Sequence, residues 1–350
     1  MNTTEELNVE GSSTPNTDVR VSVIMSVRNA ESTLRVVFDC LFASNLSNFE
    51  VVIVDDASTD GTATLCEEYG ITPIRLTQNV GPAAGRNLAV KRARGETLVF
   101  LDSDIAFAPD VLGKLLERLE ADPELAGNAV LTSMTPLNKG FYPRYFAIQE
   151  YLWMRRLLIG TRDRSLSYIS TRCGCLRRQV FEEMGGFSEC YRKPSTEDLE
   201  FSSRMGDRYL LEYYDDIEMM HCFPDTLAKI FRRYHRNTCE IVQMPPSVRK
   251  KATMPYKRDA ISRLLLCLAF LSLPIALVQP LVLGVTLALG LAVAVIQREL
   301  LLTCWAKEGF LFAVKSWVVY CVLPIPVATG VLAGMLGKWT RPVSEKACEQ

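Results

Sequence analysis

Apolar runs alternate with amphipathic stretches along the first third of the chain. Val21–Val27 is a mostly apolar run typical of a buried strand, and Leu34, Val37, Phe38 and Leu41 then recur at the spacing of one helix face. Three more strand-like runs follow, each joined to a helical pattern by a short turn. This alternation predicts an α/β fold with a doubly wound, mostly parallel sheet. The expected strands are 21–27, 51–54, 73–76 and 98–101, and the later helices are 62–69, 83–94 and 111–119.

The C-terminal third consists of long apolar segments instead. Segments 261–278 and 281–296 are nearly free of charge and are separated by a Gln-Pro pair. They predict a helical hairpin whose arms approach the minimum length for crossing a bilayer. Segment 310–336 is a third apolar run, broken by a lysine and two prolines. It predicts a third span, with a re-entrant pair or a buried soluble helical core as alternatives.

These patterns divide the chain into five parts. The N-terminal tail is polar and has no apolar period, so we expect it to be disordered. The predicted parts are the tail (1–18), the α/β domain (19–245), a basic juxtamembrane segment (246–260), about three transmembrane helices (261–337) and a polar tail (338–350).

Charge is unevenly distributed, although the formal net charge is only −1. This balance gives no reason to expect a nucleic-acid partner. Residues 225–258 hold nine Lys/Arg against two acids, directly before the first apolar segment. The positive-inside tendency therefore places the α/β domain on the cytoplasmic face of a plasma or inner membrane, where these cations can contact lipid headgroups. Three spans would leave Lys338, Arg341 and Lys346 on the far side, against the same tendency.

The stretch 141–159 is rich in aromatic residues and arginine, with apolar residues at mixed helical spacing. Such a composition is typical of a helix that lines an acceptor cleft or lies at a membrane surface. An ordinary packed helix fits the pattern equally well, so all three interpretations remain open.

The most informative motif ends the fourth predicted strand. Thr97-Leu-Val-Phe-Leu-Asp-Ser-Asp104 is an apolar run that stops on two carboxylates two positions apart. In an open parallel sheet, ligands bind outside the carboxyl ends of the strands, so Asp102 and Asp104 are expected to face that crevice. Two hard oxygen ligands there suit Mg²⁺ or Mn²⁺ holding a diphosphate. Alternatively, the pair only caps the next turn.

A second acidic pair, Asp55-Asp56, ends the second predicted strand and precedes a Ser/Thr/Gly turn. A carboxylate there can accept a hydrogen bond from a base N–H or a ribose hydroxyl. Ser58, Thr59 and Asp60 can also simply cap the helix that follows. Both roles are compatible, because capping and ligand binding use different residues of one turn.

A glycine-containing turn opens the third predicted helix. Gly81 and Gly85 permit close approach of the backbone, and a helix N-terminus favours anions. Arg86 lies in the first turns of this helix and is expected to point towards the same crevice. It would contact a nucleotide there, or form a surface ion pair.

Together these motifs resemble family 2 glycosyltransferases of the GT-A fold. The resemblance covers roughly residues 19–240, within the domain assigned to 19–245. Each motif is modest alone, but the set is specific. The matching segments, in family order and spacing, are Val21-Ser-Val-Ile-Met-Ser-Val-Arg-Asn29, Val51-Val-Ile-Val-Asp-Asp-Ala-Ser-Thr-Asp-Gly-Thr62, Gly85-Arg-Asn87, Phe100-Leu-Asp-Ser-Asp104 and Cys175-Leu-Arg-Arg-Gln-Val-Phe-Glu-Glu-Met-Gly-Gly-Phe187.

The resemblance implies a role for each matching residue. Thr196-Glu197-Asp198 matches the acid motif of the family, with Asp198 as general base and Glu197 beside it as a catalytic residue. Asp102, Asp104 and His221 are implied ligands of Mn²⁺ or Mg²⁺, with a structural hydrogen bond as the alternative for His221. Asp56 is implied to lie near the base. The implied nucleotide-sugar contacts are Val27, Asn29, Asp55, Asp56, Arg86, Asp102, Ser103, Arg233 and Arg236.

Arg233 and Arg236 lie in a segment that matches a known synthase motif only in part. Arg233-x-x-Arg236 resembles part of the Gln-x-x-Arg-Trp motif of processive synthases, but Asn237 replaces the tryptophan. This difference argues against processive polymerisation. The arginines are still expected to clamp the diphosphate, to bind lipid headgroups, or both.

The resemblance implies a membrane-anchored, inverting, metal-dependent hexosyltransferase of cell-envelope glycan, polysaccharide or glycolipid synthesis. The donor would be a UDP- or GDP-sugar, and the acceptor a lipid-linked saccharide, glycolipid or other glycan. The intact acid motif favours a hydroxyl acceptor, because a polyprenyl phosphate is already ionised and needs little help from a base. The alternatives are a polyprenyl-phosphate glycosyltransferase, a processive synthase and a non-catalytic membrane assembly protein. Loss of the acidic pairs would indicate the last of these, and none is lost.

Overall fold

The computed structural model describes residues 19–159, 168–190, 196–246, 249, 257–276 and 278–340. The tail predicted over 1–18, most of the basic segment 246–260 and nearly all of the tail 338–350 lie outside the described residues.

An eight-stranded mixed sheet forms the centre of the N-terminal domain, in the order β3-β2-β1-β4-β7-β6-β8-β5. Its first half is parallel, as predicted: β1 lies between β2 and β4, and β2 pairs with β3. The second half is mixed, because β7 runs antiparallel to both β4 and β6, whereas β8 runs parallel to β6. The strands are β1 Val21–Val27, β2 Phe49–Asp55, β3 Ile74–Arg75, β4 Thr97–Leu101, β5 Ile105–Phe107, β6 Leu125–Thr132, β7 Cys173–Arg177 and β8 Leu210–His221.

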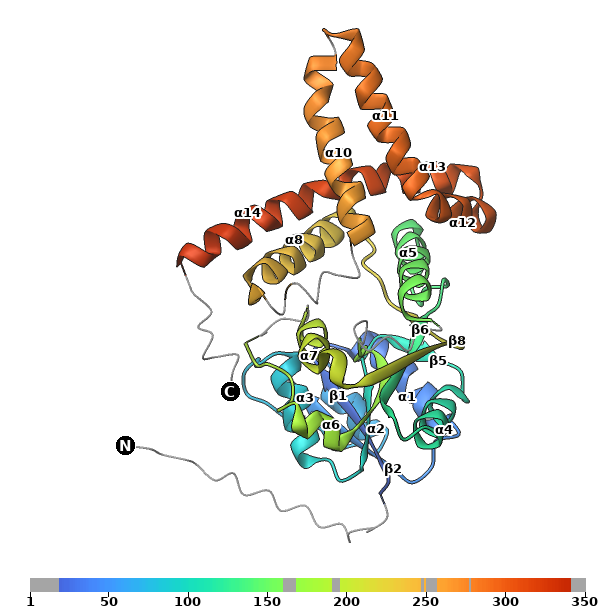
Figure 1. Cartoon of the computed structure of the whole chain (residues 1–350). Coiled ribbons are helices and arrows are strands. Elements are labelled where there is room, and N and C mark those ends of the chain that lie inside the picture. The colour runs from blue at the N-terminus through green and yellow to red at the C-terminus, as the bar shows by residue number, and fades with distance from the viewer. Residues whose placement is uncertain are drawn as a thin grey trace.

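Helices cover both faces of this sheet, which confirms the doubly wound expectation (Figure 1). The predicted apolar face Leu34, Val37, Phe38 and Leu41 is fully buried in one layer of the core. That layer contains α1 Glu31–Phe42, α2 Thr62–Glu68 and α4 Val111–Ala121; the opposite layer contains α3 Pro82–Arg92, α6 Arg178–Glu183 and α7 Glu197–Met205, which is followed by the 3₁₀ turn Gly206–Arg208.

A third hydrophobic cluster joins the domain to the C-terminal helices. Helix α5, Phe141–Leu158, buries Tyr145, Phe146 and Ile148 in this cluster. Of the interpretations left open for this stretch, a packed helix therefore holds along the buried face. The other helices of the cluster are α8 Leu227–Gln243, α10 Lys257–Ala276, α11 Pro280–Ile296, α12 Arg298–Glu308 and α13 Phe310–Val322.

Helices α10 and α11 form the predicted hairpin, which projects away from the sheet (Figure 1). Residues 264–296 contain no charged side chain. Two polar side chains inside the hairpin satisfy one another, since the hydroxyls of Ser272 and Thr286 lie 2.7 Å apart. The chain then bends by 65° between α11 and α12.

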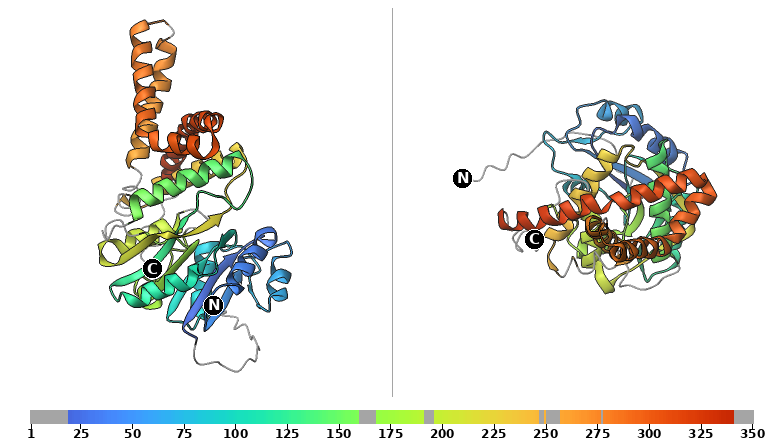
Figure 2. Two further views of the ribbon diagram at one scale, coloured as in Figure 1. Left: turned by 90° about the vertical axis from the view of Figure 1, so that its right-hand side faces the viewer. Right: turned by 90° about the horizontal axis from the view of Figure 1, so that it is seen from above.

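The third apolar run forms α13 and α14 (Pro324–Thr340), which together are long and apolar enough to cross a membrane. By length and composition, the described residues offer two candidate spans, or up to three if the bent α11–α12 pair is one span. However, α14 lies crosswise to the hairpin and along α8 in the views of Figures 1 and 2. Two glycines permit this approach: a Cβ at Gly330 would lie 2.5 Å from the His235 carbonyl oxygen, and one at Gly334 would lie 2.8 Å from that of Cys239.

Candidate active site

The two carboxylates that follow β4 lie where the parallel half of the sheet meets the antiparallel strand β7. Register Leu101↔Cys173 brings Arg172 opposite Asp102, and the Asp102 N–H donates to the Arg172 carbonyl at 3.0 Å. Strand β5 pairs with the end of β8, so that His221 approaches Asp104, with Nε2 3.5 Å from Oδ1. Residues from four strands therefore converge at the carboxyl end of β4, as expected for ligand sites in such sheets.

Arg86 connects this carboxylate pair to the acid motif on α7. Its guanidinium donates to Asp102 Oδ1 at 2.7 Å and to Glu197 Oε1 at 2.9 Å. The side chain is 5% exposed, so the alternative of a surface ion pair does not hold: both ion pairs of Arg86 are buried or partly buried. Gly85 makes the position possible, because a Cβ there would lie 2.2 Å from the Ser26 hydroxyl on β1. The Arg86 bridge thus fixes Asp102 and Glu197 relative to one another.

Asp198, the residue predicted to be the general base, lies next to this bridge at the start of α7. The Tyr168 hydroxyl donates to Asp198 Oδ2 at 2.7 Å. Burial and the adjacent charge of Glu197 raise the pKa of Asp198 to about 6, against the lowering effect of the Tyr168 hydrogen bond. A carboxylate whose pKa lies near neutrality can accept a proton and remain largely ionised at pH 7.

Asp104 and His221 are the best candidates for metal ligands. Burial and the charge of Asp102 raise the pKa of Asp104 to about 7, against the lowering effects of Arg172 and Arg233. Burial and the nearby Arg172 lower the pKa of His221 well below its usual value, so the imidazole is neutral, as a ligand must be. The described residues contain no cluster of three such ligands. Two protein ligands suit a Mg²⁺ or Mn²⁺ ion that takes its remaining oxygens from a diphosphate and water.

Two charged residues of this site were missed by the sequence analysis. Arg172 forms an ion pair with Glu150 on α5, and the Thr132 hydroxyl donates to the same carboxylate at 2.8 Å. Although burial opposes it, the charge of Arg172 lowers the pKa of Glu150 to about 2. Arg233 on α8 also acts electrostatically on Asp104 and Glu150. The site therefore combines carboxylates with partly buried positive charge.

Several residues predicted to contact the nucleotide form hydrogen bonds to the backbone of neighbouring loops. Asp56 accepts the N–H groups of Val80 and Gly81 at 2.7 and 2.9 Å, and its own N–H donates to the Val27 carbonyl at 2.9 Å. Asn29 Oδ1 accepts from the Thr59 N–H at 2.8 Å.

The remaining predicted site residues differ in what surrounds them. Asp55 accepts the N–H of Ser58 at 2.9 Å, which gives it a structural role in the turn. Ser103 is half-buried in the turn after β4. Arg236 lies one turn beyond Arg233 and has a buried Nε with no hydrogen-bond partner among the described residues. Of these two arginines, Arg233 acts electrostatically on Asp104 and Glu150.

Curated proteins with similar sequences match part of the chain. An uncharacterized glycosyltransferase of Haemophilus influenzae is 27% identical over 52% of this chain and 60% of its own length. A putative teichuronic acid biosynthesis glycosyltransferase of Bacillus subtilis, TuaG, is 37% identical over 28% of this chain and 40% of its own. The chain therefore covers less than two thirds of these relatives.

A solved structure is similar over most of the chain. The mannosyltransferase PcManGT of Pyrobaculum calidifontis, in complex with GDP-Man and Mn²⁺, matches 89% of this chain and 87% of its own with a TM-score of 0.54 and 20% identity. This likeness supports the fold alone. Residues 22–185 match the model of the family described as glycosyl transferase family 2. The chain thus has a GT-A fold whose residues 22–185 match family 2 glycosyltransferases, followed by helices apolar enough to span a membrane.

Proposed function

We propose that this chain is a membrane-anchored, inverting glycosyltransferase that moves a hexosyl group from a UDP- or GDP-sugar to a hydroxyl of a lipid-linked saccharide or glycolipid. The observation that carries the proposal is one connected set of charges. Arg86 bridges Asp102 to Glu197, Asp198 follows directly on α7, and Asp104 lies beside His221. A fold retained only for assembly would have no need to keep a carboxylate near pKa 6 next to a buried arginine bridge.

Asp198 would take the proton of the acceptor hydroxyl while that oxygen attacks the anomeric carbon. The bond from the anomeric carbon to the diphosphate oxygen breaks in the same step, so the configuration inverts and a nucleoside diphosphate leaves. Tyr168 holds the Asp198 carboxylate through its 2.7 Å hydrogen bond. Arg172 and Arg233 supply positive charge on the side of Asp104, where the departing diphosphate would gain negative charge.

Asp104 and His221 would hold the Mn²⁺ or Mg²⁺ ion, and Asp102 would face it from its place on the Arg86 bridge. When bound, such an ion stabilises the negative charge of a departing diphosphate. The neutral imidazole of His221 and the nearby Asp104 carboxylate both fit this role.

Nucleotide binding should depend on this metal site. We expect UDP or GDP to bind in the presence of Mn²⁺ and to lose at least about tenfold in affinity with EDTA or with Asp104→Asn, because the diphosphate would then face uncompensated carboxylates. Isothermal titration calorimetry on the detergent-solubilised protein measures this. The matched control is Asp110→Asn, which removes an exposed carboxylate that pairs with Lys114 on the surface. Equal affinity with EDTA or in Asp104→Asn would contradict the metal assignment.

For the membrane part, we propose that α10 and α11 cross the bilayer as a hairpin while α13 and α14 lie in the plane of the interface. Helix α10 contributes a 19-residue candidate span, Arg258–Ala276, whose charged residues all lie in its first two turns, at the base of the hairpin. The α14 helix packs along α8 through Gly330 and Gly334 and exposes Leu332 and Leu336 elsewhere. An in-plane helix with one packed and one apolar face fits an interfacial position. This topology also keeps the basic C-terminal residues on the side of the catalytic domain, which removes the conflict with the positive-inside tendency.

Sidedness of the two termini tests this topology. In sealed vesicles, epitope tags at the N- and C-termini should be digested or protected together, because a hairpin returns the chain to the side from which it entered. A three-span arrangement would leave one tag digested and the other protected, and that result would contradict the proposal. A third tag inserted after Gln279, at the hairpin turn, serves as the control, since it should show the opposite protection.

A further inference from the structure

We propose that an anionic phospholipid binds in a pocket at the base of the α10–α11 hairpin, with its phosphate on Arg298. This inference goes beyond the transfer reaction and does not depend on it, but it rests on the proposed membrane hairpin. The pocket has a volume of about 870 Å³ and is open on one side. Eight residues line it: Arg258, Ile261, Val295, Ile296, Arg298, Glu299, Leu302 and Thr303.

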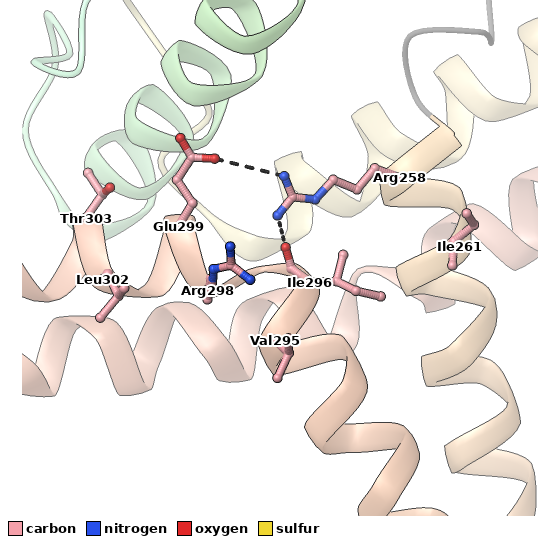
Figure 3. A pocket seen from close by; sticks show the side chains of 8 residues that line it. All are labelled: Arg258, Ile261, Val295, Ile296, Arg298, Glu299, Leu302 and Thr303. Atoms are coloured by element: carbon pink, nitrogen blue, oxygen red, sulfur yellow. Dashed lines mark hydrogen bonds and ion pairs between the residues drawn. The ribbon is translucent and has the colours of Figure 1, made fainter.

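The charges of the pocket favour an anion. Arg258 reaches across from α10 to the Ile296 carbonyl and lies 3.9 Å from Glu299, as Figure 3 shows. Glu299 also lies 3.7 Å from Arg156 on α5, so its charge is already balanced by two arginines. Arg298 is exposed and has no hydrogen-bond or ion-pair partner among the described residues. The lining therefore carries an excess positive charge that can meet a phosphate diester.

The walls of the pocket favour a lipid over a free phosphate. Ile261, Val295 and Leu302 are each more than half exposed, and they belong to three different helices. They lie at the lower end of the hairpin, where the uncharged segment 264–296 begins and ends. At the base of the hairpin, the apolar side chains can contact the acyl chain of a lipid, and the neighbouring Arg298 can contact its headgroup.

The bend at the base of the hairpin keeps this pocket open. Gln297 is buried, and its Nε2 lies 3.1 Å from Asp259, 3.0 Å from Ser262 and 2.8 Å from the Tyr320 hydroxyl. These contacts tie α10 and α13 to the point where α11 turns into α12. Arg298 is the next residue, so the bend directs α12 away from the hairpin and separates its first turn from α10.

Native mass spectrometry of the full-length, detergent-solubilised protein tests the site, with phosphatidylglycerol as the probe. We expect one phosphatidylglycerol to bind tightly, and Arg298→Gln to weaken it by about tenfold or more through loss of a charge-assisted contact. Arg298→Lys should retain part of the affinity. The matched control is Arg92→Gln, which removes an exposed arginine at the end of α3 in the catalytic domain and should leave binding unchanged.

Two ligand controls define the source of the phosphate. Phosphatidylcholine, which is zwitterionic, should bind wild type weakly. Its affinity should be no higher than the affinity of phosphatidylglycerol for Arg298→Gln. Glycerol phosphate at the same concentration should not displace the lipid, because it cannot contact the apolar walls. Equal binding of both lipids, unchanged binding in Arg298→Gln, or displacement by glycerol phosphate would each overturn the proposal.

Discussion

Replacing Asp198 by asparagine should leave donor binding intact and lower sugar transfer by about 10²- to 10⁴-fold, the usual contribution of a general base. Asparagine keeps the size of the side chain but cannot take the proton of an acceptor hydroxyl. With a pKa of about 6 for Asp198, transfer by wild type should also fall as the pH decreases through 6, since the carboxylate becomes protonated. Release of nucleoside diphosphate as a function of pH measures both effects.

The matched variant for this prediction is Tyr168→Phe. The Tyr168 hydroxyl donates to the Asp198 carboxylate and lowers its pKa, so its removal should move the acid limb of the pH profile to higher pH. A merely structural tyrosine would change the rate without moving that limb. Transfer that survives Asp198→Asn at the wild-type rate would contradict the role of Asp198 and favour an acceptor that is already ionised, such as a polyprenyl phosphate.

Replacing Arg86 by methionine should destabilise the catalytic domain by about 3–5 kcal/mol, because the carboxylates of Asp102 and Glu197 would lose their shared buried partner. For a domain of this size, such a loss corresponds to a fall in Tm of roughly 6–20 °C. Thermal unfolding followed by intrinsic fluorescence measures it.

The second variant separates charge from packing. Adding Glu197→Gln to Arg86→Met should recover part of the lost stability, since one unpaired charge is then removed. Arg92→Met, at an exposed position of the same helix, should leave Tm nearly unchanged. An Arg86→Met protein as stable as wild type would contradict the buried bridge.

The parallel half of the fold was predictable because each of its buried strands is an apolar run followed by a helix with one apolar face. Strands β6 and β8 lack this signal. Strand β6 contains Gly127 and the fully buried Asn128, whose amide donates to the Leu115 carbonyl at 2.8 Å. This tertiary contact makes a polar residue acceptable in a core, and no local pattern encodes it. The orientation of α14 could not be predicted either, because hydropathy indicates the length of an apolar helix but not its orientation.

The candidate site was likewise predictable only where its residues belong to motifs that are local in sequence. Asp102, Asp104 and Asp198 follow from motifs that are local in sequence, and Arg86 was expected in the same crevice. Arg172 was missed because its place depends on the antiparallel register between β4 and β7, which joins segments about 70 residues apart. The only local signal was an arginine directly before a short run of small buried residues, and that signal alone identifies no ligand. Tyr168 similarly reaches Asp198 from 30 residues away.

The most direct test of the account is turnover of nucleotide-sugars by the purified protein. Detergent-solubilised wild type would be incubated with Mn²⁺ or Mg²⁺ and a panel of UDP-, GDP- and TDP-sugars, with and without a lipid extract, and release of nucleoside diphosphate would be followed. The account predicts metal-dependent release from one donor that rises with the lipid extract and disappears in Asp198→Asn. No release from any donor, or release that is indifferent to both the metal and Asp198, would contradict it.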